Sequence, residues 1–152
     1  MNQVCIDLAK MIVRDGEGAT KLFQVEVTGA RSLEDAKKAA RTVAGSTLVK
    51  TAMFGENPNW GRVIAAIGYS GADFDRRRLS LTLRNEENEA VLVKDGKGVA
   101  LKGSVELEKA GKILKAREVV FTANLGVGRF DAVAFGCDLG YSYVKVNAEY
   151  TT

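Results

Sequence analysis

The clearest candidate for chemistry is a glutamate between two glycines, Glu17 in residues 16–18. Glycine adopts backbone conformations that other residues avoid, so this short segment can aim a carboxylate inward. An inward carboxylate suits the amino group of a small substrate. The alternative is an ordinary helix C-cap with Glu17 in solvent, and the spacing alone leaves both interpretations open. The segment is not a phosphate-binding P-loop, because no lysine follows the second glycine at the required spacing.

Two further segments are richer in polar residues than a scaffold needs. Residues 54–62 (FGENPNWGR) hold the only proline and the only tryptophan of the chain. They fit either a loop that meets substrate or a neighbouring chain, or a helix entry with Trp60 as a core anchor. Residues 147–152 (NAEYTT) end the chain, where fraying is the default. A run of three arginines at residues 76–78 predicts a solvated face.

Several kinds of chemistry are excluded by what the chain lacks. It has no histidine, which removes the commonest general base and the commonest zinc ligand. Cys5 and Cys137 stand far apart, so we expect two buried reduced thiols, no metal site and no cofactor. A serine or threonine nucleophile would need a lysine, a carboxylate or its own α-amine as base. The residues alone therefore predict a domain with an amino-acid-sized site.

The composition is that of an ordinary globular protein, with 46% hydrophobic residues, 27% charged residues and a formal charge of +3. No nucleic-acid-binding module is recognisable, and we expect no nucleic-acid partner. No apolar run reaches the roughly 18 residues that cross a bilayer, and no signal peptide opens the chain. We expect a soluble protein of a reducing compartment, the cytoplasm, without a membrane partner.

Hydrophobic periodicity places these segments on a mixture of helices and strands. Helical spacing or capping signals predict helices over residues 4–14, 32–45, 60–69 and 104–114. Residues 141–150 fit either a helix or a strand, and we favour the helix. Alternation or short apolar runs predict strands over residues 22–28, 48–54, 79–83, 90–93, 118–125 and 130–139, with a hairpin at 79–93. We predict N-caps at Ser32, with Asp35 three residues later, and at Asn59. The expected fold class is α+β: a single layered domain over residues 1–152, with a mixed sheet packed by helices.

Three long motifs together resemble the C-terminal part of the ornithine acetyltransferase, or glutamate N-acetyltransferase, family of arginine biosynthesis. They are residues 7–21 (DLAKMIVRDGEGATK), 49–69 (VKTAMFGENPNWGRVIAAIGY) and 136–152 (GCDLGYSYVKVNAEYTT). The resemblance covers almost the whole chain, in order and with sensible spacing. It implies the fold of that family's C-terminal domain and transfer of an acetyl group from N-acetylornithine to glutamate. Some members of the family also accept acetyl-CoA as donor.

The same resemblance implies site residues. Glu17 matches the family's substrate-binding glutamate, and Asn147 and Thr152 match substrate-binding positions at its C-terminus. The final residues are then expected to be ordered over the active site rather than frayed. Residues 54–62 receive no catalytic role, only a structural or near-site one. The ligands implied are N-acetylornithine, ornithine and glutamate.

The family's nucleophile has no match in this chain. Family precursors cleave themselves before an internal threonine, which becomes the N-terminal nucleophile, with its new α-amine as base. That Ala-Thr pair leads into an apolar segment upstream of the DGEGATK motif, whereas Ala19 and Thr20 lie inside the motif and precede Lys21. We therefore expect no catalytic residue in this chain, inactivity in isolation, and a partner in the upstream part of the same enzyme within a homo- or hetero-oligomer.

Two alternatives belong to other functional classes. One is a non-catalytic amino-acid-binding module that kept the family's pocket, and binding of ornithine or glutamate would favour it. The other is an assembly module whose apolar surface meets copies of itself or a missing part. Concentration-dependent association would favour this second alternative.

Overall fold

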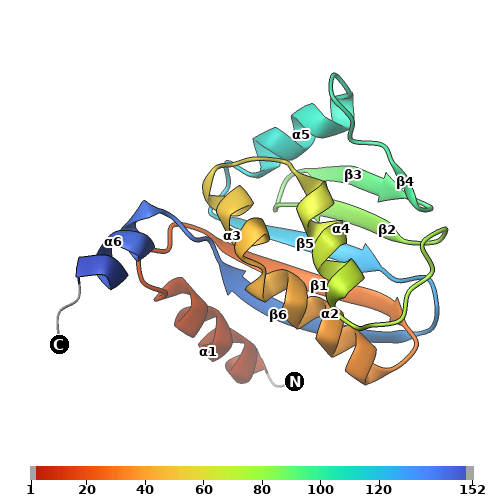
Figure 1. Ribbon diagram of the computed structural model, residues 1–152, viewed down its shortest axis with the longest axis horizontal. Helices are drawn as coiled ribbons and strands as arrows, with labels where there is room; N and C mark the ends of the chain where they lie inside the picture. Colours follow the sequence, from red (N-terminus) through yellow and green to blue (C-terminus); the bar gives the residue numbers. More distant parts are fainter. Residues whose placement is uncertain (1–2, 150–152) are drawn as a thin grey trace.

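Six strands form a single sheet that carries most of its helices on one face (Figure 1). The computed structural model describes residues 3–149. The helices are α1 Gln3–Arg14, α2 Leu33–Gly45, α3 Thr47–Phe54, α4 Trp60–Tyr69, α5 Val105–Ile113 and α6 Tyr141–Glu149. The strands are β1 Leu22–Ala30, β2 Ser80–Arg84, β3 Glu89–Lys94, β4 Lys97–Gly98, β5 Glu118–Asn124 and β6 Phe130–Cys137. The expected α+β fold with a mixed sheet is confirmed.

The strand order β4-β3-β2-β5-β1-β6 places β1 between two strands from the last third of the chain. β1 and β5 are parallel, and the other neighbouring strands are antiparallel. The predicted hairpin is confirmed as the antiparallel pair of β2 and β3. Because β6 pairs with β1, the segment before β1 and the segment after β6 meet at the same end of the sheet.

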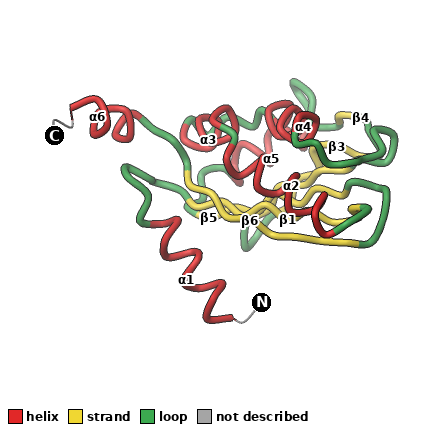
Figure 2. Tube along the Cα trace, turned by 60° about the horizontal axis from the view of Figure 1, so that its bottom comes forward, coloured by secondary structure: helices red, strands yellow, loops and turns green. Residues whose placement is uncertain are grey.

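Alternation along the strands separates a buried face from an open one. In β1, Phe23, Val25 and Val27 are fully buried, and they point toward the helices that cover this face. Figure 2 shows α2, α3, α4 and α5 on the same side of the strands. The core is therefore one layer between the sheet and these four helices.

The opposite face of the sheet carries a half-buried polar cluster centred on Glu26 of β1. Its carboxylate accepts hydrogen bonds from Arg84 Nη2 at 2.9 Å, Thr122 Oγ1 at 2.9 Å and Gln24 Nε2 at 2.7 Å. The donors come from β1 and from its neighbours across two strands, so the cluster ties β1, β5 and β2 together. A half-buried carboxylate is tolerated here because it is paired with a cation and hydrogen-bonded.

The predicted helix starts are confirmed in position. Ser32 caps α2, with its hydroxyl oxygen 3.0 Å from the backbone nitrogen of Asp35. Asn59 occupies the N-cap position of α4 but makes no capping hydrogen bond through its side chain. The predicted position of the N-cap at Asn59 is thus confirmed, but the side chain of Asn59 does not form the capping hydrogen bond.

The prediction of a strand over residues 48–54 is wrong, because the segment forms helix α3. Its buried residues Val49, Ala52 and Met53 recur at helical spacing, which puts one side of the segment into the core. Ser46 provides the N-cap, with its hydroxyl oxygen 3.5 Å from Val49 N. A short apolar run does not distinguish a strand from a buried helix. Here the N-cap at Ser46 favours the helix.

The predicted N-terminal helix is confirmed, but its apolar side is not covered by the described chain. Leu8 is 53% exposed, Met11 60% and Ile12 75%, and no residue of α1 is fully buried. The expectation of two buried thiols is therefore wrong for Cys5, which is exposed on α1, while Cys137 at the end of β6 is half-buried. Both cysteines are free.

Candidate substrate-binding site

Glu17 lies in the turn between α1 and β1, in the glycine-flanked segment that the sequence singled out. Gly18 adopts a positive φ of 66°, which favours glycine. A Cβ atom on Gly18 would lie 2.6 Å from Ser142 Cβ and 2.9 Å from Tyr143 N. The absence of a side chain at Gly18 therefore lets the first turn of α6 approach the Glu17 segment.

The structure brings together two of the three predicted site residues. Asn147 lies on α6, and its Nδ2 donates to Glu17 Oε2 at 2.9 Å across 130 positions of sequence. The same nitrogen donates to the carbonyl of Tyr143 one helical turn earlier, at 2.9 Å. The predicted helix at the C-terminal end is confirmed as α6, whereas Thr152 lies outside the described residues, as does the expected ordering of the last residues.

The pair presents acceptors to solvent. Glu17 and Asn147 are both exposed. A carboxylate is an acceptor only, and the Asn147 carboxamide keeps an acceptor oxygen once its nitrogen has been used. Such an arrangement can bind an ammonium group, which has three donors and no acceptor. The geometry suits a cationic amine on a small molecule.

Sequence reasoning missed Asp138, the residue that connects the two segments of the site. It follows β6 directly, and it is 3% exposed. Its carboxylate accepts three hydrogen bonds from Thr20 and Lys21, at distances of 2.6 to 2.9 Å. A single aspartate has no spacing signature, and its partners lie 118 and 117 positions away, so no local pattern could have found it.

The segment between β6 and α6 is fixed against α3. A Cβ atom on Gly140 would lie 2.4 Å from the Phe54 ring, so glycine allows the backbone to pass directly over that ring. The rings of Phe54 and Tyr141 meet edge to face, with their centroids 5.4 Å apart. Leu139 N donates to Lys50 O at 3.2 Å. These contacts connect the start of α6 to the first half of the 49–69 motif.

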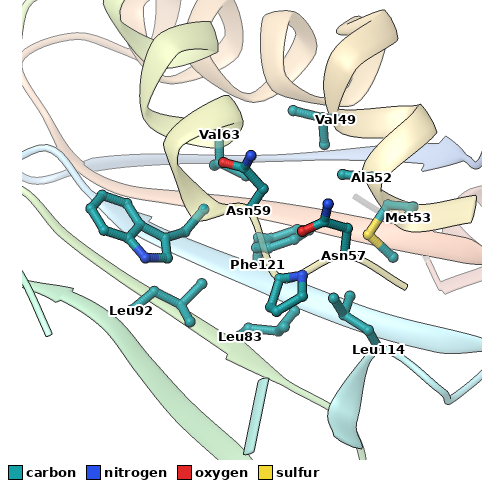
Figure 3. Close-up of a pocket in the computed structure, with 12 residues that line it drawn as sticks. Val49, Ala52, Met53, Asn57, Asn59, Val63, Leu83, Leu92, Leu114 and Phe121 are labelled. Atoms are coloured by element: carbon teal, nitrogen blue, oxygen red, sulfur yellow. The ribbon is translucent and has the colours of Figure 1, made fainter. Parts of the chain in front are cut away.

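The 54–62 segment packs as a structural element. The indole Nε1 of Trp60 donates to the buried Ala100 carbonyl at 2.8 Å, and the ring packs on Gly98. Glu56 binds Lys21 Nζ at 3.0 Å. Figure 3 shows the small apolar cavity beneath the segment, whose volume of about 10 Å³ holds one water at most. This cavity has no room for an amino acid, and it does not include Glu17 or Asn147.

An open hollow of about 300 Å³ lies beside the Glu17 segment. It is lined by Arg14, Ala19, Thr20, Lys21, Leu22, Arg117 and Glu118. Arg14 forms an ion pair with Glu118 across it.

The three arginines at residues 76–78 are exposed, which confirms the predicted solvated face.

Within residues 3–149, no three metal-ligating side chains converge. Helices long and apolar enough to cross a membrane are likewise missing from this described part.

Comparison with known proteins identifies the family. The ArgJ family model matches residues 1–152, the whole chain. The chain belongs to the ArgJ family. It is 54% identical over 149 residues to a glutamate N-acetyltransferase of Methanocaldococcus jannaschii. It is 53% identical over 149 residues to an arginine biosynthesis bifunctional protein ArgJ of Symbiobacterium thermophilum. The family resemblance of the three motifs is therefore confirmed.

The match covers most of this chain and a smaller part of its relatives. Each of these two alignments covers 98% of this chain. They cover only 37% of the Methanocaldococcus protein and 35% of the Symbiobacterium protein. The crystal structure of ArgJ from Bacillus halodurans superimposes with a TM-score of 0.86 at 44% identity. That superposition covers 97% of this chain and 66% of the other. The described fold is therefore that of part of an ArgJ protein.

Proposed function

We propose that this chain is the C-terminal, substrate-binding part of a glutamate N-acetyltransferase that moves an acetyl group from N-acetylornithine to glutamate. The observation that carries the proposal is the hydrogen bond between Glu17 and Asn147. These residues are 130 positions apart, and both match substrate-binding positions of the family by motif. Their meeting at one surface gives a common place for the ligand.

The acceptors at this surface match the amines of the proposed ligands. N-acetylornithine carries a free ammonium on its side chain, and glutamate carries one on its α-carbon. Either group can donate to the Glu17 carboxylate, because opposite charges and a charged donor give the stronger class of hydrogen bond. We assign Thr152 to the same site from its motif position.

We further propose that the nucleophile comes from the upstream part of the enzyme. Thr20 is the one candidate within the motif, and its hydroxyl donates to Asp138 Oδ2 at 2.6 Å. Its backbone nitrogen is a peptide amide that donates to Asp138 Oδ1 at 2.7 Å, so it is not a free α-amine. Both groups that an N-terminal nucleophile needs are thus engaged in structural hydrogen bonds.

The exposed side of α1 supports an assembly partner. Leu8, Met11 and Ile12 form an apolar face that nothing within residues 3–149 buries. Such a face marks an interaction site in a folded protein. We assign it to the upstream part of the enzyme, in keeping with a chain that spans 37% of a relative. A second copy of this chain is the competing occupant, which would make the chain an assembly module.

The test is acetyl transfer from N-acetylornithine to glutamate, measured for the chain alone and after addition of the upstream polypeptide. We expect no transfer by the chain alone and transfer after reconstitution. Activity of the isolated chain would show that the nucleophile is within the 152 residues, with Thr20 the first residue to replace. Failure of both samples, with both polypeptides folded and associated, would refute the proposal.

A further inference from the structure

Asp138 is the only charged residue that is buried within residues 3–149, and it is 3% exposed. The predicted site gives it no role. A buried carboxylate is costly unless hydrogen bonds replace its water, so its surroundings must be arranged to receive it. The sequence places it between β6 and α6, next to the site but outside the Glu17–Asn147 contact.

All of the side-chain hydrogen bonds of Asp138 go to the segment that carries Glu17. Oδ1 accepts from the backbone nitrogens of Thr20 at 2.7 Å and Lys21 at 2.9 Å. Oδ2 accepts from the Thr20 hydroxyl at 2.6 Å. The Asp138 backbone nitrogen donates to Lys21 O at 3.1 Å, which extends the pairing of β1 and β6 by one residue. The carboxylate thus holds the end of the Glu17 segment to the end of β6.

This anchor matters because α6 has little packing of its own. No residue of α6 from Tyr141 to Glu149 is buried, and Figure 1 shows the helix extending away from the body of the sheet. Apart from the edge-to-face contact of Tyr141 with Phe54, hydrophobic packing therefore does little to fix the position of Asn147. The contacts of α6 with the Glu17 segment are the close approach at Gly18 and the Asn147–Glu17 hydrogen bond. Both depend on where the segment and the start of α6 are held.

We infer that Asp138 is a positioning residue that holds the Glu17 segment against α6 and thereby sets the geometry of the Glu17–Asn147 pair. The inference rests on the proposed function of that pair as the amino-acid site. Asp138 contacts neither Glu17 nor Asn147 by any hydrogen bond of the described chain, so it acts through the backbone of residues 17–21. Its loss would widen the pair without removing either ligand group.

The direct test is NMR of the Asn147 side-chain amide in five forms of the chain: wild type, Asp138→Asn, Thr20→Val, Glu106→Gln and, as the reference for a broken Glu17–Asn147 contact, Glu17→Ala. Asp138→Asn keeps the size of the side chain, but the carboxamide nitrogen cannot accept a hydrogen bond from the Thr20 hydroxyl. Thr20→Val removes that one hydrogen bond and leaves the carboxylate. Glu106 is the matched control, because it too is a carboxylate that accepts a backbone amide, from Val91 at 2.7 Å, on a distant helix.

We expect the Asn147 amide signals to move in Asp138→Asn toward their positions in Glu17→Ala, with a smaller move in Thr20→Val and none in Glu106→Gln. Signals that stay at their wild-type positions in folded Asp138→Asn and Thr20→Val would overturn the inference. They would show that Asp138 stabilises the fold without affecting the surroundings of the Asn147 amide. If Asp138→Asn fails to fold, Thr20→Val decides alone.

Calorimetry with glutamate and with ornithine completes the test and separates it from the proposed function. Loss of hydrogen bonds to a charged group predicts that Asp138→Asn weakens binding about tenfold or more, while Glu106→Gln leaves it unchanged. Unchanged affinity in a folded Asp138→Asn chain would overturn the inference. Failure of the wild-type chain to bind either amino acid would count against the proposed function, and the NMR signals would still decide the role of Asp138.

Discussion

At the scale of single residues, the candidate site depends on a few positions where backbone and side chain meet closely. Glu17 and Asn147 share one hydrogen bond at 2.9 Å, and Gly18 allows the helix of Asn147 to approach. The sequence motifs predicted the two polar residues through their resemblance to a family. They did not predict Asp138, because a hydrogen bond across 118 positions leaves no trace in local spacing.

Gly18→Ala tests the close approach. The added Cβ would overlap Ser142 and Tyr143, so we expect α6 to be displaced and ligand binding to be lost. The positive φ of Gly18 adds a backbone cost of about 1–2 kcal/mol. Gly103→Ala is the matched control, because Gly103 also has a positive φ but has no neighbour within 4 Å of a Cβ atom. Urea unfolding should show a similar loss of stability for both variants, and calorimetry a loss of binding for Gly18→Ala alone. Wild-type affinity in Gly18→Ala would contradict this account.

At the scale of elements, strong periodicity predicted most helices and strands, and the failures have physical causes. The run at residues 48–54 is apolar enough to fit a buried strand, and only the Ser46 cap and the spacing of its buried residues make it a helix. The helix at residues 4–14 was predicted from its apolar spacing. That spacing could not reveal that its apolar face stays uncovered in this chain, because burial depends on a partner element.

Trp60→Phe tests the structural reading of the 54–62 segment. The change removes the hydrogen bond to the Ala100 carbonyl, and we expect it to lower the free energy of unfolding by about 1–3 kcal/mol. Affinity for glutamate and ornithine should stay at the wild-type value. Tyr69→Phe is the aromatic control. The Tyr69 hydroxyl also donates a hydrogen bond, to Ser46 Oγ at 3.1 Å, but Tyr69 is 64% exposed. Loss of affinity with unchanged stability in Trp60→Phe would instead place the segment in the site.

At the scale of the whole molecule, one face of the sheet is packed by helices, while α1 lies on the other side of the strands from α3 and α4 (Figure 2). The two terminal helices of the described chain both adjoin the Glu17 segment, because α1 leads directly into it and α6 contacts it. The exposed face of α1 and the 37% coverage of a relative are the observations behind the proposed upstream partner.

The double variant Leu8→Gln and Ile12→Gln tests the docking role of α1. Because neither side chain is buried, we expect the free energy of unfolding to change by no more than about 0.5 kcal/mol. Association with the upstream polypeptide, measured by analytical ultracentrifugation, should weaken at least about tenfold from the lost apolar contact. Leu33→Gln on α2, a leucine that is 47% exposed, should leave association unchanged. Wild-type association in the double variant would show that the upstream part binds elsewhere.

The measurement that tests the central claim most directly is acetyl transfer from N-acetylornithine to glutamate by the reconstituted enzyme carrying Glu17→Gln. Glu87→Gln, an exposed glutamate in the β2–β3 turn, is the control. Removing the charge that we propose to receive the substrate ammonium should lower kcat/KM about a hundredfold, because one partner of a charged hydrogen bond is lost, while the control keeps the wild-type rate. Wild-type kcat/KM in Glu17→Gln would contradict the assignment of Glu17 and Asn147 as the amino-acid site.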